Sequence, residues 1–271
     1  MNVFIFANCQ GSVLQHFLPS SFSIHHRNNY CYINETQLDT DIQELLTTCD
    51  YFIYQPLSSI YPVYNTDNLK TYIKSTCKTI SFPYIFNNAF TPIFKSFKRD
   101  IAIKGEYVRN GGDDITYENA TPILELKERG YTLPDILNKY DANEIDFRYK
   151  ERFDNTIAIL KNKEIETDVK VSQFIIDNHK KYRLFNYHNF IDLDCTFASH
   201  PSNILINEYA NQILKLMELN QVHYEGDELL IATTLVSRYD INYYNYEWVN
   251  TESESINDII KKIISEIYMK F

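Results

Sequence analysis

Cys9 lies where a predicted buried strand gives way to a predicted helix, and its thiol is the first candidate for chemistry. The run Val3–Phe6 is apolar, β-branched and aromatic, which is typical of a buried strand. Asn8, Gly11 and Ser12 break this run, and apolar residues then recur at helical spacing. A thiol at a helix start faces backbone N–H groups and the positive end of the helix dipole, and both favour the thiolate. The sequence therefore offers a nucleophile, and the alternative is a small apolar residue packed under the sheet.

His200 is the candidate base for this thiol. It directly precedes Pro201 and a predicted amphipathic helix that starts at Ser202 or Asn203. An imidazole titrates in the range needed to take the proton of a thiol or to hold it as thiolate. His188 lies in a polar and aromatic segment and remains the competing base.

The turn around Cys9 also carries the hydrogen-bond donors that an oxyanion requires. Backbone N–H groups from Cys9 to Gly11, with the side chain of Gln10 or Asn8, could hold the negative charge of a carbonyl oxygen in the transition state. The other predicted pocket residues follow further strands or begin the helix after His200, and they are Gln55, Tyr84, Ser202 and Asn203.

The elements that must position these groups alternate along the first 82 residues. Strands are predicted at 2–7, 51–55 and 78–82, with helices between them, which indicates a parallel sheet with right-handed crossovers. Ligands of such sheets bind at the carboxyl ends of the strands. We therefore expect Cys9, Gln55 and Tyr84 to cluster at that edge.

The rest of the chain reads as additions to a single α/β domain over residues 1–271, an open parallel sheet with flanking helices. Residues 84–165 are predicted to form a helical insertion, a cover or lid with a short helix at 89–97 and a longer one at 143–162. Residues 22–24 and 30–33 read as a strand pair or one interrupted strand, with His25, His26 and Arg27 in a turn that is either solvated or grips an anion. The last amphipathic helix is predicted at 255–268.

Composition excludes several classes of protein. The net charge of −10 argues against nucleic acid as the default partner, because phosphate binding needs clustered Lys and Arg. Five widely spaced cysteines without a CxxC pair argue against a disulfide framework and a zinc site, and favour a reducing compartment. Neither a signal peptide nor an apolar run of membrane length is found, so the prediction is a cytoplasmic protein without a transmembrane segment.

Several short segments together resemble the WcbI family of bacterial capsular-polysaccharide biosynthesis proteins, which are regarded as acetyltransferases. The likeness runs in family order from residue 2 to about residue 218. Its carriers are Ala7-Asn8-Cys9-Gln10, the Tyr54-Gln55-Pro56-Leu57 turn, Phe82-Pro83-Tyr84, Arg183-Leu184-Phe185 and His200-Pro201-Ser202-Asn203. Ala7 replaces the usual glycine of the family, and the interval between Phe185 and His200 is longer than usual.

This resemblance implies a fold related to the SGNH hydrolases and a flavodoxin-like three-layer arrangement. It also implies acetyl-CoA as cosubstrate, no metal, and a carbohydrate acceptor, with Cys9 in place of the SGNH serine and His200 as its histidine. Residues that could hold the phosphates of coenzyme A are Arg109, Arg183, His25, His26 and Arg27, in no order of preference. A thiol-dependent esterase or deacetylase and a non-catalytic binding protein for coenzyme A or glycan remain alternatives. The acceptor sugar, the acyl group and the formation of a homo-oligomer stay open.

Overall fold

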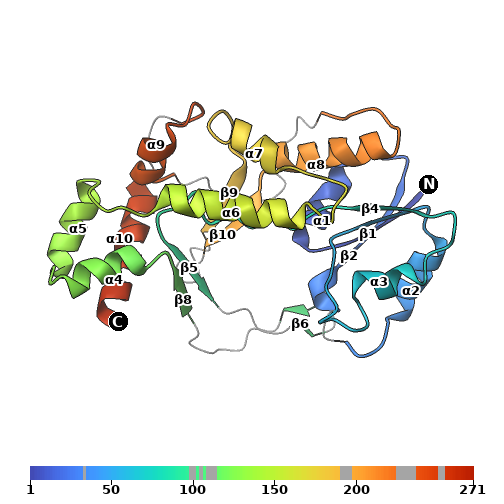
Figure 1. The fold of residues 1–271 in the computed structure, drawn as a ribbon, viewed down its shortest axis with the longest axis horizontal. Helices are drawn as coiled ribbons and strands as arrows, with labels where there is room; N and C mark the ends of the chain where they lie inside the picture. The colour runs from blue at the N-terminus through green and yellow to red at the C-terminus, as the bar shows by residue number, and fades with distance from the viewer. Residues whose placement is uncertain are drawn as a thin grey trace.

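A four-stranded parallel sheet forms the part of the molecule that carries the predicted nucleophile (Figure 1). The computed structural model describes residues 1–32, 35–97, 102–103, 106–107, 115–189, 197–223, 236–249 and 254–271. The sheet consists of β1 (Asn2–Ala7), β2 (Ser23–Asn28), β3 (Tyr51–Tyr54) and β4 (Lys78–Ser81), in the order β2-β1-β3-β4. All three pairings are parallel, which confirms the prediction for β1, β3 and β4.

The strand order reverses its direction at β1. The chain leaves β1 for β2 on one side and later returns to the other side as β3, which pairs with β1 from Val3↔Tyr51 to Phe6↔Tyr54. In open α/β sheets the crevice outside the carboxyl ends of two such strands is the usual place for a ligand. Cys9 follows β1 and Gln55 follows β3, so both lie at this point of reversal.

Helices cover both faces of the sheet because its strands are apolar on both faces. Val3, Ile5 and Ala7 share a buried cluster with the helices α1 (Cys9–Leu14), α6 (Tyr149–Lys163) and α8 (Asn203–Leu216). Phe4 and Phe6 point the other way, into a second cluster with α2 (Thr40–Thr48) and α3 (Thr66–Lys70). This is the predicted three-layer arrangement.

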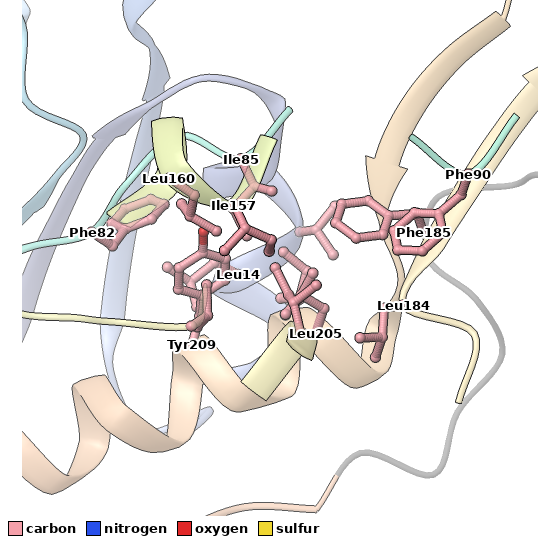
Figure 2. Close-up of a cluster of buried hydrophobic side chains, with 14 of the residues drawn as sticks. Leu14, Phe82, Ile85, Phe90, Ile157, Leu160, Leu184, Phe185, Leu205 and Tyr209 are labelled. Carbon is pink, nitrogen blue, oxygen red and sulfur yellow. The ribbon is translucent and has the colours of Figure 1, made fainter. Parts of the chain in front are cut away.

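The larger cluster joins elements from opposite ends of the chain. Figure 2 shows Leu14 of α1 close to Leu205 and Tyr209 of α8, with Ile157 of α6 packed among them. Tyr209 is buried, and its hydroxyl donates to the carbonyl of Pro83 at 2.8 Å. α8 is therefore fixed against both α1 and the chain that leaves β4.

Several of the remaining described elements, the C-terminal helix among them, lie away from the sheet (Figure 1). Antiparallel pairs are formed by β5 (Phe94–Phe97) with β8 (Ile115–Glu118), β6 (Ala102–Ile103) with β7 (Glu106–Tyr107), and β9 (Phe185–Asn189) with β10 (Phe197–Pro201). The short 3-10 turns are η1 (Gln15–Phe17) and η2 (Asn29–Cys31), and the other helices are α4 (Thr121–Glu128), α5 (Leu133–Asp141), α7 (Ser172–Asn178), α9 (Arg238–Tyr244) and α10 (Glu254–Lys270). Within the described ranges, no helix combines the length and the apolar character needed to cross a membrane.

Three sequence predictions of secondary structure are wrong. His25, His26 and Arg27 lie inside β2, because pairing with β1 uses backbone hydrogen bonds that do not depend on apolar side chains. Residues 94–97 form β5 where a helix was expected. Within the described parts of the insertion the first helix begins at Thr121, and the role of the insertion as a lid stays a prediction. The long helix begins at Tyr149 because Arg148 has φ 52°, a left-handed conformation outside the helical range.

Candidate active site

Cys9 and His200 meet at the carboxyl edge of the sheet. Cys9 is the first residue of α1, directly beyond β1, and His200 lies in β10 just before α8. The Sγ atom of Cys9 is 3.7 Å from Nδ1 of His200, within reach of a hydrogen bond to sulfur. For Nδ1 to accept the proton of the thiol, the imidazole must be neutral and carry its own proton on Nε2. The predicted contact is confirmed, although the two residues are 191 positions apart.

The turn at Cys9 is held by hydrogen bonds within itself. Asn8 caps α1, with its Oδ1 accepting from the N–H of Gln10 at 2.9 Å and its carbonyl accepting from the N–H of Gly11 at 2.9 Å. The hydroxyl of Ser12 donates to the carbonyl of Cys9 at 2.6 Å. Since α1 has only six residues, its dipole is short, and the imidazole of His200 is the described group placed to take the proton of the thiol.

Gln10 and Gln55 form a buried latch that joins three chain segments. Gln55 accepts the N–H of Asn8 at 2.9 Å through Oε1, and it donates through Nε2 to Oε1 of Gln10 at 3.2 Å. Gln10 in turn donates to the carbonyl of Ile85 at 2.6 Å and accepts the N–H of Ile85 at 3.3 Å. Only 1% of Gln10 and 3% of Gln55 is exposed. Both side chains therefore hold the turn in place and are already engaged by protein partners.

The same hydrogen bonds reduce the number of groups near Cys9 that can donate to an oxyanion. The N–H groups of Asn8, Gln10 and Gly11 all donate to protein acceptors. The side-chain nitrogen Nδ2 of Asn8, in contrast, donates to no group in the described part of the chain, and Asn8 is only partly buried. Of the two side chains that sequence reasoning offered, the carboxamide of Asn8 is thus the one open to a ligand.

Gly11 is required by the close approach of two neighbours. A Cβ atom on Gly11 would lie 2.7 Å from Cβ of Ala7 and 3.0 Å from two ring atoms of His26. The ring of His26 is anchored by a hydrogen bond from Nε2 to the carbonyl of Asn8 at 3.3 Å. Burial lowers the pKa of His26, which favours the neutral ring.

Gly11→Ala is therefore expected to destabilise the fold by about 1–3 kcal/mol, as overpacking of a filled core does, and to displace the turn that holds Cys9. The thermal midpoint should fall, and the rate of Cys9 alkylation by iodoacetamide should change. Gly130→Ala is the matched control: Gly130 has φ +87° with no atom near its missing Cβ, so this variant should lose stability through backbone strain and keep the wild-type alkylation rate. A Gly11→Ala variant with unchanged midpoint and rate would contradict the close packing.

The predicted phosphate-binding cations that the structure describes are not gathered at one place. Because side chains alternate along a strand, His26 faces α1, whereas His25 and Arg27 belong to the opposite face of β2. Arg183 lies next to β9, where its carbonyl accepts the hydroxyl of Ser202 at 2.7 Å. Arg109 lies outside the described residues.

Ser202 and Asn203 are placed at the start of α8, as predicted. Ser202 is fully buried, and its N–H donates to the carbonyl of Leu184 at 2.9 Å. Its hydroxyl is also engaged by protein, so Ser202 fixes the backbone that follows His200. Asn203, the first residue of α8, is 8% exposed. His188 lies in β9 opposite Ala198, two pairs away from His200, which pairs with Asn186.

Lys163 is a residue of this region that sequence reasoning missed. It ends α6, and its ammonium donates to the carbonyl of Tyr84 at 3.1 Å and lies 4.8 Å from the centre of the Tyr84 ring. Tyr84 is 42% exposed and precedes Ile85, the backbone partner of Gln10. Among the described residues Lys163 has no carboxylate partner, and partial burial lowers its pKa. No sequence signal distinguishes it from the other lysines of that helix.

Comparisons with known proteins agree with this architecture. The family model described as polysaccharide biosynthesis enzyme WcbI matches residues 2–222. A solved structure of WcbI, described as native protein without a disulfide bond between coenzyme A and one of its cysteines, aligns with a TM-score of 0.73. It is 16% identical, and the alignment covers 100% of this chain and 90% of that one, so this likeness concerns the fold. A search of curated proteins finds no match. On the family match, which spans most of its length, the chain belongs to the WcbI family of polysaccharide biosynthesis enzymes.

Proposed function

We propose that this protein transfers an acetyl group from acetyl-CoA to a hydroxyl of a sugar in polysaccharide biosynthesis, through an acyl-enzyme on Cys9. The observation that carries the proposal is the 3.7 Å contact between Sγ of Cys9 and Nδ1 of His200 at the switch point of the sheet. A thiol with an adjacent imidazole is the arrangement that activates a cysteine nucleophile. Membership of a polysaccharide biosynthesis family and a structural relative whose description names coenzyme A and a cysteine support it.

The residues near Cys9 fit a coenzyme A thioester. A small thiol at the edge of the sheet suits exchange with another thioester, because the two thioesters have nearly equal energy. The ammonium of Lys163 and the exposed ring of Tyr84 offer a cation for phosphate and an aromatic face for the adenine base. When bound, the coenzyme supplies the activated acetyl group, and the chain supplies the nucleophile, the base and the oxyanion donor.

In the first half-reaction His200 takes the proton of Cys9 on Nδ1, and the thiolate attacks the thioester carbonyl. The negative charge on the carbonyl oxygen is stabilised by Nδ2 of Asn8. His200 then returns the proton to the departing thiol, which leaves Cys9 acetylated. The latch of Gln10 and Gln55 keeps the turn rigid throughout, as positioning of reacting groups demands.

In the second half-reaction His200 removes the proton from the sugar hydroxyl, whose oxygen attacks the acetyl group on Cys9. The new ester bond forms as the bond between sulfur and the carbonyl carbon breaks, and the thiolate of Cys9 leaves. His200 returns the proton to sulfur and restores the starting state. His200 thus serves both half-reactions, because it returns the proton to the departing sulfur at the end of each and is ready to act as a base again.

The proposal is tested by incubating the protein with acetyl-CoA and measuring its intact mass. We expect one acetyl adduct on the wild type, mapped to Cys9, and none on Cys9→Ala. An adduct that persists until a polysaccharide acceptor is added supports transfer. Rapid release into water without acceptor would instead assign a thiol-dependent esterase or deacetylase, and coenzyme A affinity without any adduct would assign a binding protein.

Lys163→Met should weaken binding of coenzyme A by roughly 10- to 150-fold, the loss of one charge-assisted hydrogen bond to phosphate. Binding of pantetheine, which has no phosphate, should be unchanged, and isothermal titration with both ligands measures the difference. Lys161→Met is the matched control, because Lys161 lies in the last turn of the same helix, whereas the contacts to Tyr84 are made by Lys163. This variant should not alter either affinity. Equal weakening for coenzyme A and pantetheine would mean that Lys163 only braces the loop at Tyr84.

A further inference from the structure

Two thiols face one another at the edge of the sheet opposite Cys9. Cys49 ends α2 just before β3, and Cys77 lies just before β4, so both sit at the amino ends of neighbouring strands. Their Sγ atoms are 3.5 Å apart although the residues are 28 positions apart in the chain. Neither belongs to the candidate active site.

The backbone around the pair is fixed on several sides. The carboxylate of Asp50 accepts the N–H of Asn2 at 2.8 Å and pairs with the ammonium of Lys74 at 2.9 Å. The carbonyl of Asp50 accepts the N–H of Lys78 at 2.9 Å, which ties the start of β3 to the start of β4. The two thiols are therefore held close together by the fold.

The two thiols differ in their access to solvent and in the ease with which they ionise. Cys49 is 2% exposed, and burial, with the hydrogen bond to Cys77, raises its pKa to about 12. Burial also raises the pKa of Cys77, but the hydrogen bond from Cys49 and the ammonium of Lys74 oppose this rise. Cys77, which is only partly buried, is thus the thiol that ionises first and the one that a small oxidant can reach.

We propose that Cys49 and Cys77 form a reversible disulfide, a redox-sensitive link across the amino edge of the sheet whose oxidant is a low-molecular-weight disulfide. The sulfur atoms must approach from 3.5 Å to a bond length of about 2.05 Å, which rotation of the two side chains can supply. The link ties β3 to β4 at the end away from Cys9, so it closes without involving the nucleophile.

The chemistry balances in two exchange steps. The thiolate of Cys77 attacks one sulfur of the small disulfide, forms a mixed disulfide and releases one small thiolate, which takes up the proton that Cys77 lost. Cys49 then gives up its proton and attacks the sulfur of Cys77, releasing the second small thiol. The protein loses two hydrogen atoms and two electrons pass to the small disulfide, which ends as two thiols.

The experiment uses the full chain with Cys9→Ser, so that no adduct forms at the nucleophile, and oxidised glutathione as the probe. We expect the intact mass to fall by two hydrogen atoms without a glutathione adduct, and peptide mapping to join Cys49 to Cys77. The thermal midpoint should rise by about 5 °C or more, because a disulfide restricts the unfolded chain, and dithiothreitol should reverse the change.

Controls separate this pair from the other thiols. Cys31→Ser should still form the link, because Cys31 is a buried thiol outside the pair, whereas Cys77→Ala should abolish both the mass change and the rise in midpoint. Three outcomes would each overturn the proposal. Glutathione could remain bound at Cys77 without closing the link, a different cysteine could form the link, or both thiols could stay reduced although they alkylate in the same buffer. If Cys77→Ala folds poorly, peptide mapping of the disulfide in the chain that keeps both Cys49 and Cys77 still tests the proposal.

Discussion

Cys9→Ala is expected to abolish acyl transfer, with kcat falling on the order of 10⁴-fold or more, as removal of a nucleophile does in related covalent mechanisms. Alanine cannot form the acyl-enzyme, and its methyl group is smaller than the thiol, so the buried turn should tolerate it. The N–H of Gln10 still has its acceptor in Asn8, and the latch with Gln55 is unaffected. Transfer is measured by release of coenzyme A and by acetylation of the acceptor.

We also expect Cys9 to react with alkylating agents faster than the other described cysteines. Burial raises the pKa of Cys31, Cys49 and Cys77, whereas Cys9 lies beside an imidazole. Near neutral pH, iodoacetamide should therefore alkylate Cys9 faster than any of these three thiols. Cys31→Ala is the control for loss of a cysteine that is buried after β2, and its turnover should match the wild type. Full turnover in Cys9→Ala would remove the cysteine from the mechanism altogether.

His200→Ala is expected to slow transfer by about 10²–10⁴-fold, the usual contribution of general acid–base catalysis. The variant keeps the thiol but has no group to take its proton. Its residual rate should climb as the pH rises towards the ordinary pKa of a thiol near 8.5, because solvent then ionises Cys9 without help. Coenzyme A affinity should be retained, which distinguishes a lost base from a damaged binding site. Rates across pH, with binding measured in parallel, check both expectations.

His188→Ala is the matched control for this change. His188 occupies the strand that pairs with β10, but its register places it opposite Ala198 and not beside His200. Its replacement should leave the rate and its pH profile close to those of the wild type. If instead His188→Ala loses turnover while His200→Ala keeps it, the base belongs to β9 and the mechanism must be rewritten around that residue.

Contiguous stretches of sequence determined the strands β1, β3 and β4 and the position of the nucleophile. An apolar run such as Val3–Phe6, ended by polar residues, predicts a buried strand from consecutive residues alone. Alternation of such runs with helices implies parallel pairing, and parallel pairing gathers the carboxyl ends at one edge. The sequence pattern therefore predicted that the turns after β1 and β3 lie close together, and the pairing of the two strands confirms it.

Only the first residues of β2 could be found in this way, and residues 25–27 were expected to form a turn. Its residues 23–28 include two histidines and an arginine, and none of its side chains is fully buried, because it is the outer strand next to β1. The hydrogen bonds that define it come from the backbone of β1, 21 positions earlier in register, and leave no apolar pattern. The strand in turn separated His26 from His25 and Arg27, which the sequence had grouped as one cationic cluster.

Only the tertiary structure decided which distant groups touch. The sequence favoured His200, which precedes a predicted helix, and left His188 as the competing base. Packing of α8 on α1 brought His200 to 3.7 Å from Cys9. The latch of Gln10 with Gln55, the ammonium of Lys163 over Tyr84 and the facing thiols of Cys49 and Cys77 have the same origin. Local patterns state which side of an element is buried, but the partner on that side is chosen by the packing of the whole chain.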